Sequence, residues 1–212
     1  MADDYAQARA SLVDRLRQRE YVESDRVADA IEAVPRHEFV PEGQRSQAYA
    51  DRPLSIGNDQ TVSAPHMVAL MTELLDPDPD DRVLEVGTGC GYHAAVTAEV
   101  VPEGHVYTVE YDAELASEAE TRLERLGYDQ RVSVRVGDGR EGWSEKAPFD
   151  GAYVTCAVPD VPDALREQVA PGGRIVAPVG DVHQELLVLD KRADGTFERS
   201  EHGSVRFVRI RG

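Results

Sequence analysis

Lysine is almost absent from this sequence. Among 212 residues only Lys146 and Lys191 are lysine, and 40 acidic residues outnumber 23 basic ones, which gives a formal net charge of −17. A surface with this charge repels phosphate backbones and anionic lipid headgroups. We therefore expect neither a nucleic acid nor a membrane among the partners of this protein.

The chain is also poor in cysteine and has no long apolar run. Cys90 and Cys156 show no metal-like spacing with each other or with the six histidines, so no metal site is predicted. The amino terminus lacks the basic and apolar regions of a secretion signal, and no stretch approaches the ~18 apolar residues of a membrane span. We expect a cytoplasmic protein, and its length suits a single domain.

The excess of carboxylates has a second interpretation. At ~1 M ionic strength the screening length falls to ~3 Å, and the mutual repulsion of surface carboxylates then becomes tolerable. The composition is therefore typical of a halophilic protein. An ordinary acidic cytosolic protein is the alternative.

The most informative stretch runs from Arg82 to His93. Its apolar residues predict a buried parallel strand, and Gly87, Gly89 and Gly91 predict a tight turn into a helix. Glu110 ends the next predicted strand, where a carboxylate can bind the two hydroxyls of a ribose. The glycine spacing departs from the dinucleotide pattern G-x-G-x-x-G, because the third glycine comes one position early. This departure favours a nucleoside cofactor without a pyrophosphate, namely S-adenosylmethionine.

Strands and helices alternate after position 82, which predicts an α/β fold with a mostly parallel, doubly wound sheet. The predicted strands are 82–86, 105–110, 131–136, 149–155 and 174–179, followed by an antiparallel pair at 185–190 and 204–210 around a turn at Asp194-Gly195. The predicted helices are 5–19, 25–34, a helix that begins within 63–66 and ends at 75, 91–100, 113–126 and 161–169.

One domain over residues 1–212 is expected, in three parts. Residues 1–80 form a helical cap with a substrate loop, 81–180 form the cofactor-binding core, and 181–212 form the C-terminal strands. The irregular stretch from 36 to 62 is rich in proline and glycine. Loops of this length inside a domain are commonly lids or binding elements, so residues 41–63 are predicted to close over the site.

Several segments resemble those of protein-L-isoaspartate O-methyltransferases. They are Pro35–Pro41, Tyr49–Gly57, Gln60–Met67, Glu85–Tyr92, Gly137–Gly139, Ala147–Asp150 and Gly172–Gly180. The resemblance runs from about residue 21 to 210. It implies a Rossmann-like class I methyltransferase that moves a methyl group from S-adenosylmethionine to the free carboxylate of an isoaspartyl residue, which starts protein repair. The product would be S-adenosylhomocysteine, the partners isoaspartyl-containing peptides and proteins, and the expected state a monomer.

The resemblance also implies roles for individual residues. Ser63 is the expected catalytic residue, because its hydroxyl would bond the acceptor carboxylate. Glu85 and the glycines would lie at the methionine end of the cofactor, Glu110 at the ribose, and Asp138 with Gly139 at the adenine. The full set of expected cofactor-binding residues is Gln60, Thr61, His66, Glu85, Gly87, Thr88, Gly89, Gly91, Glu110, Asp138 and Gly139.

Three positions depart from the pattern of the family. Asp59 stands where bacterial relatives commonly have glycine, Cys90 replaces a usual serine, and His93 replaces a usual glutamine. A charge at position 59 would repel an acceptor carboxylate unless the side chain points to solvent.

Each expected role has a structural alternative. Ser63 could cap the helix that follows it, and Glu110 could be a solvated carboxylate at a strand end. Asp138 could serve only the turn, and His66 could be a surface imidazole.

Alternatives also remain for the function as a whole. One is a methyltransferase for another acceptor, such as a small acid or an RNA base. The second is an NAD-dependent oxidoreductase, which the glycine spacing and the lack of a catalytic domain oppose. The third is a catalytically silent binding module on the same fold.

Overall fold

The computed structural model describes the chain from residue 2 onward and its side chains from residue 4 onward. Its helices are α1 (Ala2–Gln18), α2 (Asp25–Ala33), α3 (Pro65–Leu75), α4 (Tyr92–Val100), α5 (Ala113–Arg125) and α6 (Asp163–Gln168). Short 3-10 helices are η1 (Arg36–Glu38), η2 (Glu42–Gln47), η3 (Gly139–Glu141) and η4 (Ser144–Lys146). The strands are β1 (Leu54–Gly57), β2 (Gln60–Val62), β3 (Arg82–Val86), β4 (His105–Glu110), β5 (Val132–Val136), β6 (Phe149–Val154), β7 (Val169–Val179), β8 (Gln184–Lys191) and β9 (Phe197–Val205).

The central sheet has the strand order β5-β4-β3-β6-β7-β8-β9. The strands from β5 to β7 pair in parallel, and β8 and β9 add an antiparallel end. The order of the chain reverses between β3 and β6, because β4 lies on one side of β3 and β6 on the other. In open α/β sheets the crevice at such a reversal, outside the carboxyl ends of the strands, holds the ligand. The predicted fold class is confirmed.

Strand β3 contributes alternate side chains to two hydrophobic cores, one on each face of the sheet. Val83 packs into the core shared with α1 to α5, whereas Leu84 and Val86 pack into the core shared with α6. Glu85 belongs to the same face as Val83, because alternate side chains of a strand share a face. The Glu85 carboxylate therefore lies on the face of the sheet that faces the core shared with α1 to α5, among buried residues.

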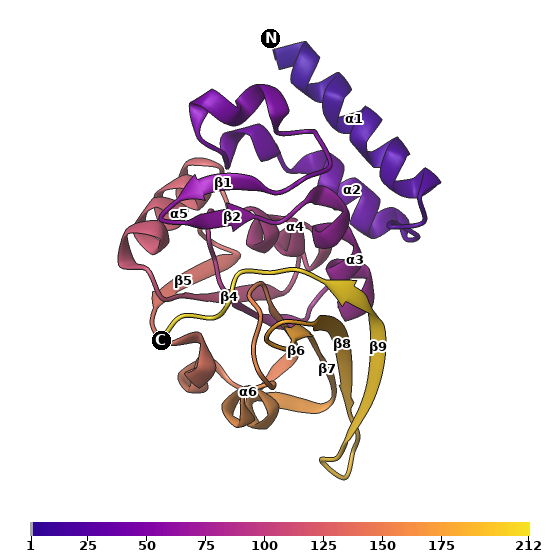
Figure 1. Ribbon diagram of the computed structural model, residues 1–212, viewed down its shortest axis with the longest axis vertical. Helices are drawn as coiled ribbons and strands as arrows, with labels where there is room; N and C mark the ends of the chain where they lie inside the picture. The colour runs from indigo at the N-terminus through magenta and orange to yellow at the C-terminus, as the bar shows by residue number, and fades with distance from the viewer. Residues whose placement is uncertain (1) are drawn as a thin grey trace.

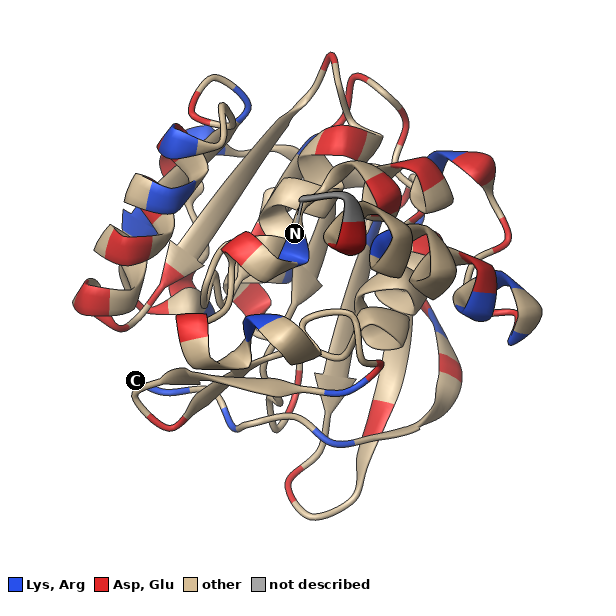
Figure 2. Ribbon diagram, turned by 90° about the horizontal axis from the view of Figure 1, so that it is seen from above, with Lys and Arg blue, Asp and Glu red and all other residues tan. Residues whose placement is uncertain are grey.

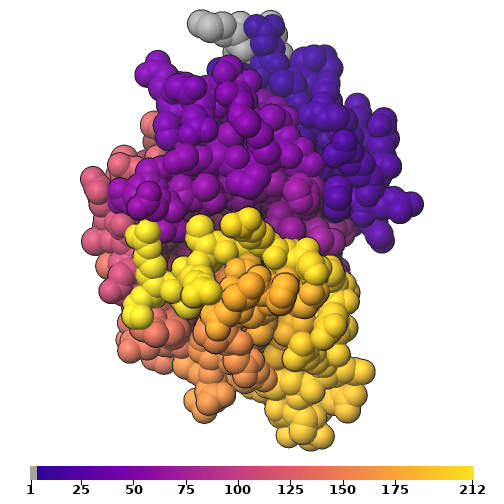
Figure 3. All heavy atoms as spheres, in the orientation of Figure 1, coloured from indigo at the N-terminus to yellow at the C-terminus, as the bar shows by residue number. Residues whose placement is uncertain are grey.

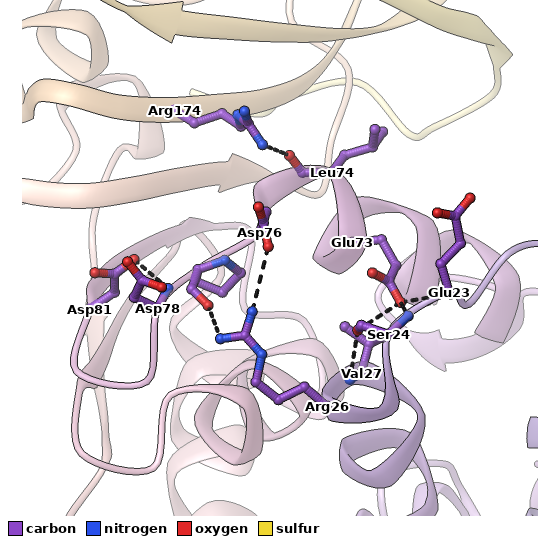
Figure 4. Close-up of polar contacts among 11 residues, drawn as sticks. Glu23, Ser24, Arg26, Val27, Glu73, Leu74, Asp76, Asp78, Asp81 and Arg174 are labelled. Atoms are coloured by element: carbon purple, nitrogen blue, oxygen red, sulfur yellow. Dashed lines mark hydrogen bonds and ion pairs between the residues drawn. The ribbon is translucent and has the colours of Figure 1, made fainter.

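Helix α2 packs against α1, α3 and α4, and polar contacts join α2 to α3 and α3 to the sheet (Figures 1 and 4). Ser24 caps α2 and accepts a hydrogen bond from the Val27 amide. The Glu73 carboxylate of α3 accepts hydrogen bonds from the Glu23 and Ser24 amides and from the Ser24 hydroxyl. Arg174 of β7 then donates to the Leu74 carbonyl at the end of α3. These contacts fix α3, whose first turn follows the candidate residue Ser63.

Two predicted boundaries at the C-terminal side are wrong. The last strand is Phe197–Val205 and not 204–210, because the turn at Asp194-Gly195 sets the register and pairs Lys191 with Phe197. Residues 206–212 leave the sheet and form only an isolated bridge between Ala157 and Arg209. Strand β7 also begins earlier than predicted, at Val169, directly after the short helix α6.

The stretch from 36 to 62 is less irregular than its composition indicates. It holds η1, η2 and the antiparallel hairpin of β1 and β2. Asn58 and Asp59 form the turn of this hairpin with positive φ angles of 49° and 57°. Aspartate and asparagine tolerate this left-handed conformation better than most residues, so the backbone of the turn accepts Asp59. The Asp59 side chain is exposed to solvent.

Acidic residues are spread over the helices and loops of the whole periphery (Figure 2). The C-terminal segment differs, because it carries Arg206, Arg209 and Arg211 within its last seven residues. Among the residues that the structure describes, no helix is both long enough and apolar enough to cross a bilayer.

Candidate functional site

The turn after β3 has a backbone that only glycine adopts without strain. Gly87, Gly89 and Gly91 have φ angles of 98°, 54° and 86°. A Cβ atom at Gly87 would lie 2.3 Å from the Thr155 hydroxyl oxygen, and one at Gly89 would lie 3.3 Å from the Ile56 side chain. The turn therefore passes closely between the end of β6 and the hairpin. The N–H groups of the three glycines are bonded within the protein, to the Val109 carbonyl, the Glu110 carboxylate and the Thr88 carbonyl, so the glycines serve close approach of the backbone.

A cavity lies at this turn. It stands at the reversal of strand order, where open α/β sheets hold their ligands. Its walls come from the hairpin, the ends of β3, β4 and β6, and the C-terminal segment. The lining residues include Ile56, Gln60, Thr61, Gly87, Gly89, Glu110, Tyr111, Asp112, Gly139, Thr155, Cys156, Arg209 and Arg211.

Glu110 is held at the edge of this cavity by the backbone. One carboxylate oxygen accepts a hydrogen bond from the Gly89 amide at 2.8 Å, and the other accepts one from the Asp112 amide at 3.0 Å. Each carboxylate oxygen can accept a further bond. The predicted pairing with ribose hydroxyls therefore fits this side chain, because it is oriented and retains free acceptor capacity.

A second cavity shares Thr61, Gly87, Gly89 and Thr155 with the first. Glu85 lines this second cavity from β3, and Ser63 lines it from the segment before α3. The two cavities therefore adjoin each other, and we call the first the wide cavity and the second the narrow cavity.

Glu85 is fully buried and its carboxylate is only half satisfied. One oxygen accepts a hydrogen bond from the Thr108 hydroxyl at 2.6 Å, whereas Oε1 has no hydrogen-bond partner. Burial raises the pKa of this carboxyl to about 8, against hydroxyl contacts from Thr108 and Tyr153 that lower it. A buried carboxylate without a partner is costly. The α-ammonium group of S-adenosylmethionine would supply the missing positive charge and donor, so the cofactor fits the residues present.

Ser63 lines the narrow cavity and does not cap α3. The cap position of that helix is Ala64, which makes no side-chain cap bond. Asp51 serves instead, since its Oδ1 accepts the His66 amide at 2.9 Å. The capping alternative for Ser63 is therefore wrong, and its hydroxyl is left to the cavity.

The structure does not bring every expected residue to the cavities. His66 bonds Asp51 through Nδ1 at 2.8 Å and packs against Tyr21, and it lines neither cavity. Asp138 caps η3 and pairs with Arg140, which lowers the pKa of its carboxyl, while the neighbouring Gly139 does line the wide cavity. The remaining expected residue outside the two linings, Gly91, stands at the start of α4.

The C-terminal segment is the part of the site that the sequence pattern missed. Val208, Arg209, Ile210 and Arg211 line the wide cavity although a strand was predicted there. Figure 3 shows this segment lying against the region of the hairpin. In the sequence, the one feature that sets this segment apart is its cluster of arginines in an acidic chain. His93 was noted only as a departure from the family, yet it lines the narrow cavity.

A family model of protein-L-isoaspartate(D-aspartate) O-methyltransferase matches residues 7–212. This chain belongs to that family. A protein-L-isoaspartate O-methyltransferase of Methanopyrus kandleri is 54% identical over 217 residues, which cover 100% of this chain and 96% of the relative. The second such enzyme of Archaeoglobus fulgidus is 54% identical over 210 residues, which cover 99% of this chain and 95% of the relative.

Solved structures of the family have the same fold. A protein-L-isoaspartate O-methyltransferase structure superposes with a TM-score of 0.88 at 32% identity, over 96% of this chain and 66% of that one. A structure from Plasmodium falciparum in complex with S-adenosyl-L-homocysteine superposes with a TM-score of 0.84 at 23% identity, over 96% of this chain and 98% of that one. The second likeness concerns the fold alone.

Proposed function

We propose that this chain transfers a methyl group from S-adenosylmethionine to the free carboxylate of L-isoaspartyl residues in damaged proteins, which initiates their repair. Family membership supports the reaction. The observation that carries it is one cavity lined by both Glu85, with an unpartnered buried carboxylate oxygen, and Ser63, with a hydroxyl that no helix uses. An acceptor and a cationic donor could thus meet in one place.

Bound S-adenosylmethionine supplies a methyl group on a sulfonium, which an anionic oxygen can displace in line. The acceptor is a carboxylic acid with a reference pKa of ~4 and is ionised at neutral pH, so no general base is required. Opposite charges cancel as the reactants meet. This chain therefore has to align them and exclude water, which is worth several kcal/mol in well-oriented reactions.

The residues divide this work between them. Ser63 would donate a hydrogen bond to the acceptor carboxylate and orient its attacking oxygen. Gln60 and Thr61 come from β2 and line the wide cavity, where they would cover the nucleoside. Glu85 and Glu110 would hold the two ends of the cofactor. Ile56 of the hairpin would exclude water where the two cavities meet, because its side chain lies close to Gly89.

Methyl incorporation distinguishes this proposal from its rivals. The protein is given labelled S-adenosylmethionine with an isoaspartyl peptide, and the matching aspartyl peptide is the control. Transfer to the first peptide alone is expected. Transfer to neither peptide, despite cofactor binding measured by calorimetry, would instead support a silent binding module or a different acceptor.

We infer further that the protein acts as a monomer in the cytoplasm on isoaspartyl peptides and proteins, without nucleic acid or membrane. The net charge of −17 supports the last two points. The spread of carboxylates over the periphery supports adaptation to concentrated salt (Figure 2). One acidic patch would instead indicate a single cationic partner.

A further inference from the structure

His93 is a buried acceptor that none of the roles above uses. It lies in the first turn of α4, is 6% exposed, and lines the same narrow cavity as Glu85. Its Nδ1 atom has no hydrogen-bond partner. Within the part of the chain that the structure describes, six buried side-chain atoms lack a partner, and Glu85 Oε1 and His93 Nδ1 are the two whose residues line this cavity.

Thr72 decides which form of the imidazole is present. Its hydroxyl donates to the Val68 carbonyl at 2.8 Å, so its single proton is already used. The same hydroxyl oxygen lies 3.1 Å from His93 Nε2 and must accept from it. The proton of the neutral ring is therefore on Nε2, which leaves Nδ1 as a lone pair.

The ring remains neutral over the range in which the protein would work. Burial lowers the pKa of His93 to about 3. The ring also packs against Tyr153, with centroids 4.2 Å apart, and Tyr153 accepts a hydrogen bond from Thr97 at 3.0 Å. The orientation of His93 is thus supported on two sides, by Thr72 and by Tyr153.

Once Glu85 is ionised, the narrow cavity offers two acceptors and no competing donor from these two side chains. In that state a carboxylate would be disfavoured, because neither the Glu85 carboxylate nor the His93 Nδ1 lone pair can donate to it. An ammonium group suits both, since it carries three N–H donors and a positive charge. Neutral imidazole is a weaker partner than carboxylate, but a buried acceptor without a donor is costly, so a donor at Nδ1 stabilises the complex.

We propose that His93 Nδ1 accepts a hydrogen bond from the α-ammonium group of the bound cofactor, next to Glu85, and that Thr72 sets the tautomer that makes this possible. The inference rests on the proposed function, because it requires an amino-acid-bearing nucleoside in the site. His93 is then a cofactor-binding residue and Thr72 a positioning residue.

A cycle over protein and ligand isolates this contact. Binding of S-adenosylhomocysteine and of its analogue without the amino group is measured by calorimetry on the full chain. For His93→Leu we expect at least a tenfold loss of affinity for S-adenosylhomocysteine and less than a threefold loss for the analogue. His93→Gln keeps an acceptor oxygen and is expected to stay within threefold of the wild type on both ligands.

Val100→Ala is the matched control for a loss of packing, since Val100 is buried at the other end of the same helix. It should weaken both ligands equally, if at all. Equal losses for both ligands in His93→Leu would overturn the proposal while leaving the proposed function intact. A wild type that binds neither ligand would overturn the proposed function as well.

A measurement on the unaltered chain covers the case in which His93→Leu fails to fold. The ¹⁵N chemical shifts of the His93 ring report its tautomer directly. We expect an unprotonated Nδ1 that shifts when S-adenosylhomocysteine binds and stays in place when the deaminated analogue binds. In Thr72→Val the protonated nitrogen should change. A protonated Nδ1 in the wild type would refute the inference.

Discussion

The guanidinium group of Arg211 donates a hydrogen bond to the backbone carbonyl of Asn58 over 3.0 Å. With its amide oxygen turned toward the same guanidinium, Gln60 accepts a second bond at 2.7 Å. On its other side Asn58 donates to the Asp112 carboxylate at 3.0 Å. The turn of the hairpin is therefore held between the end of the chain and the start of α5, over the wide cavity.

Arg211→Ala should loosen the hairpin without unfolding the protein. Contacts made by exposed arginines contribute about 0–1 kcal/mol, so the free energy of unfolding should change by no more than about 1 kcal/mol. We expect faster amide hydrogen exchange in residues 54–62 and a several-fold weaker affinity for S-adenosylhomocysteine. Arg192→Ala is the control, since Arg192 pairs with Glu198 beside a turn at the far end of the sheet. Unchanged exchange in Arg211→Ala would contradict the role given to this contact.

Ser63→Ala should separate turnover from binding. Its hydroxyl is expected to contact the acceptor, so kcat should fall at least tenfold while the affinity for S-adenosylhomocysteine stays within twofold. Because Ser63 does not cap α3, the thermal unfolding midpoint should not change. Asp51→Ala, which removes the actual cap of that helix, should lower the unfolding free energy by about 1 kcal/mol. Loss of kcat and of cofactor affinity together in Ser63→Ala would place the hydroxyl elsewhere.

Glu85 should make cofactor binding depend on pH. Its folded-state pKa of about 8 lies above the ordinary value of 4.5, so the folded protein holds this proton more tightly between those two values. The free energy of unfolding of the ligand-free protein therefore loses up to ~1.4 kcal/mol per pH unit as pH rises through this window.

An ammonium ligand requires the ionised carboxylate, so it must expel the proton. Affinity for S-adenosylhomocysteine should then rise up to tenfold per pH unit from about pH 6 toward pH 8. Calorimetry in buffers of different ionisation enthalpy should detect the released proton. Glu85→Gln should bind more weakly and without this slope. A wild-type affinity that is flat across the range would show that Glu85 is not the group that pairs with the ammonium.

Asp59→Gly tests the one charged departure from the family near the site. Asp59 has a φ angle of 57° in the hairpin turn and is exposed, and glycine adopts that conformation freely. Turnover should remain within twofold of the wild type. Asp59→Ala places a residue there that resists positive φ and should lower activity more, through the hairpin. A collapse of activity in Asp59→Gly would assign the carboxylate a role of its own.

Potassium chloride should stabilise the protein if the acidic surface is adapted to salt. With a net charge of −17, screening relieves repulsion among carboxylates that crowd the folded state. The thermal unfolding midpoint and the methyl-transfer rate should both rise from 0.1 M to about 1 M salt and beyond. Activity that falls steadily over the same range would reject adaptation to salt and favour an ordinary acidic protein.

The sequence by itself determined the elements that depend on local pattern. Branched apolar residues before three alternate glycines specify a buried strand and a tight turn wherever they occur, and Glu110 follows at the end of the next strand. These features act over a few residues, so strands, helices and cofactor class could be predicted from them. The boundaries that failed, around 197–212, lie where a hairpin register and not an apolar pattern chose the pairing.

Only the tertiary structure decided which side chains complete the site. Arg211 and Asn58 are 153 positions apart, Asp51 reaches the first turn of α3 from the loop before β1, and Thr72 fixes the tautomer of His93 from another helix. Hydrogen bonds of this kind depend on the distance between folded segments, and no local periodicity encodes that distance. Whether the Ser63 hydroxyl caps α3 likewise depends on which side chain the fold places at the N-terminus of that helix.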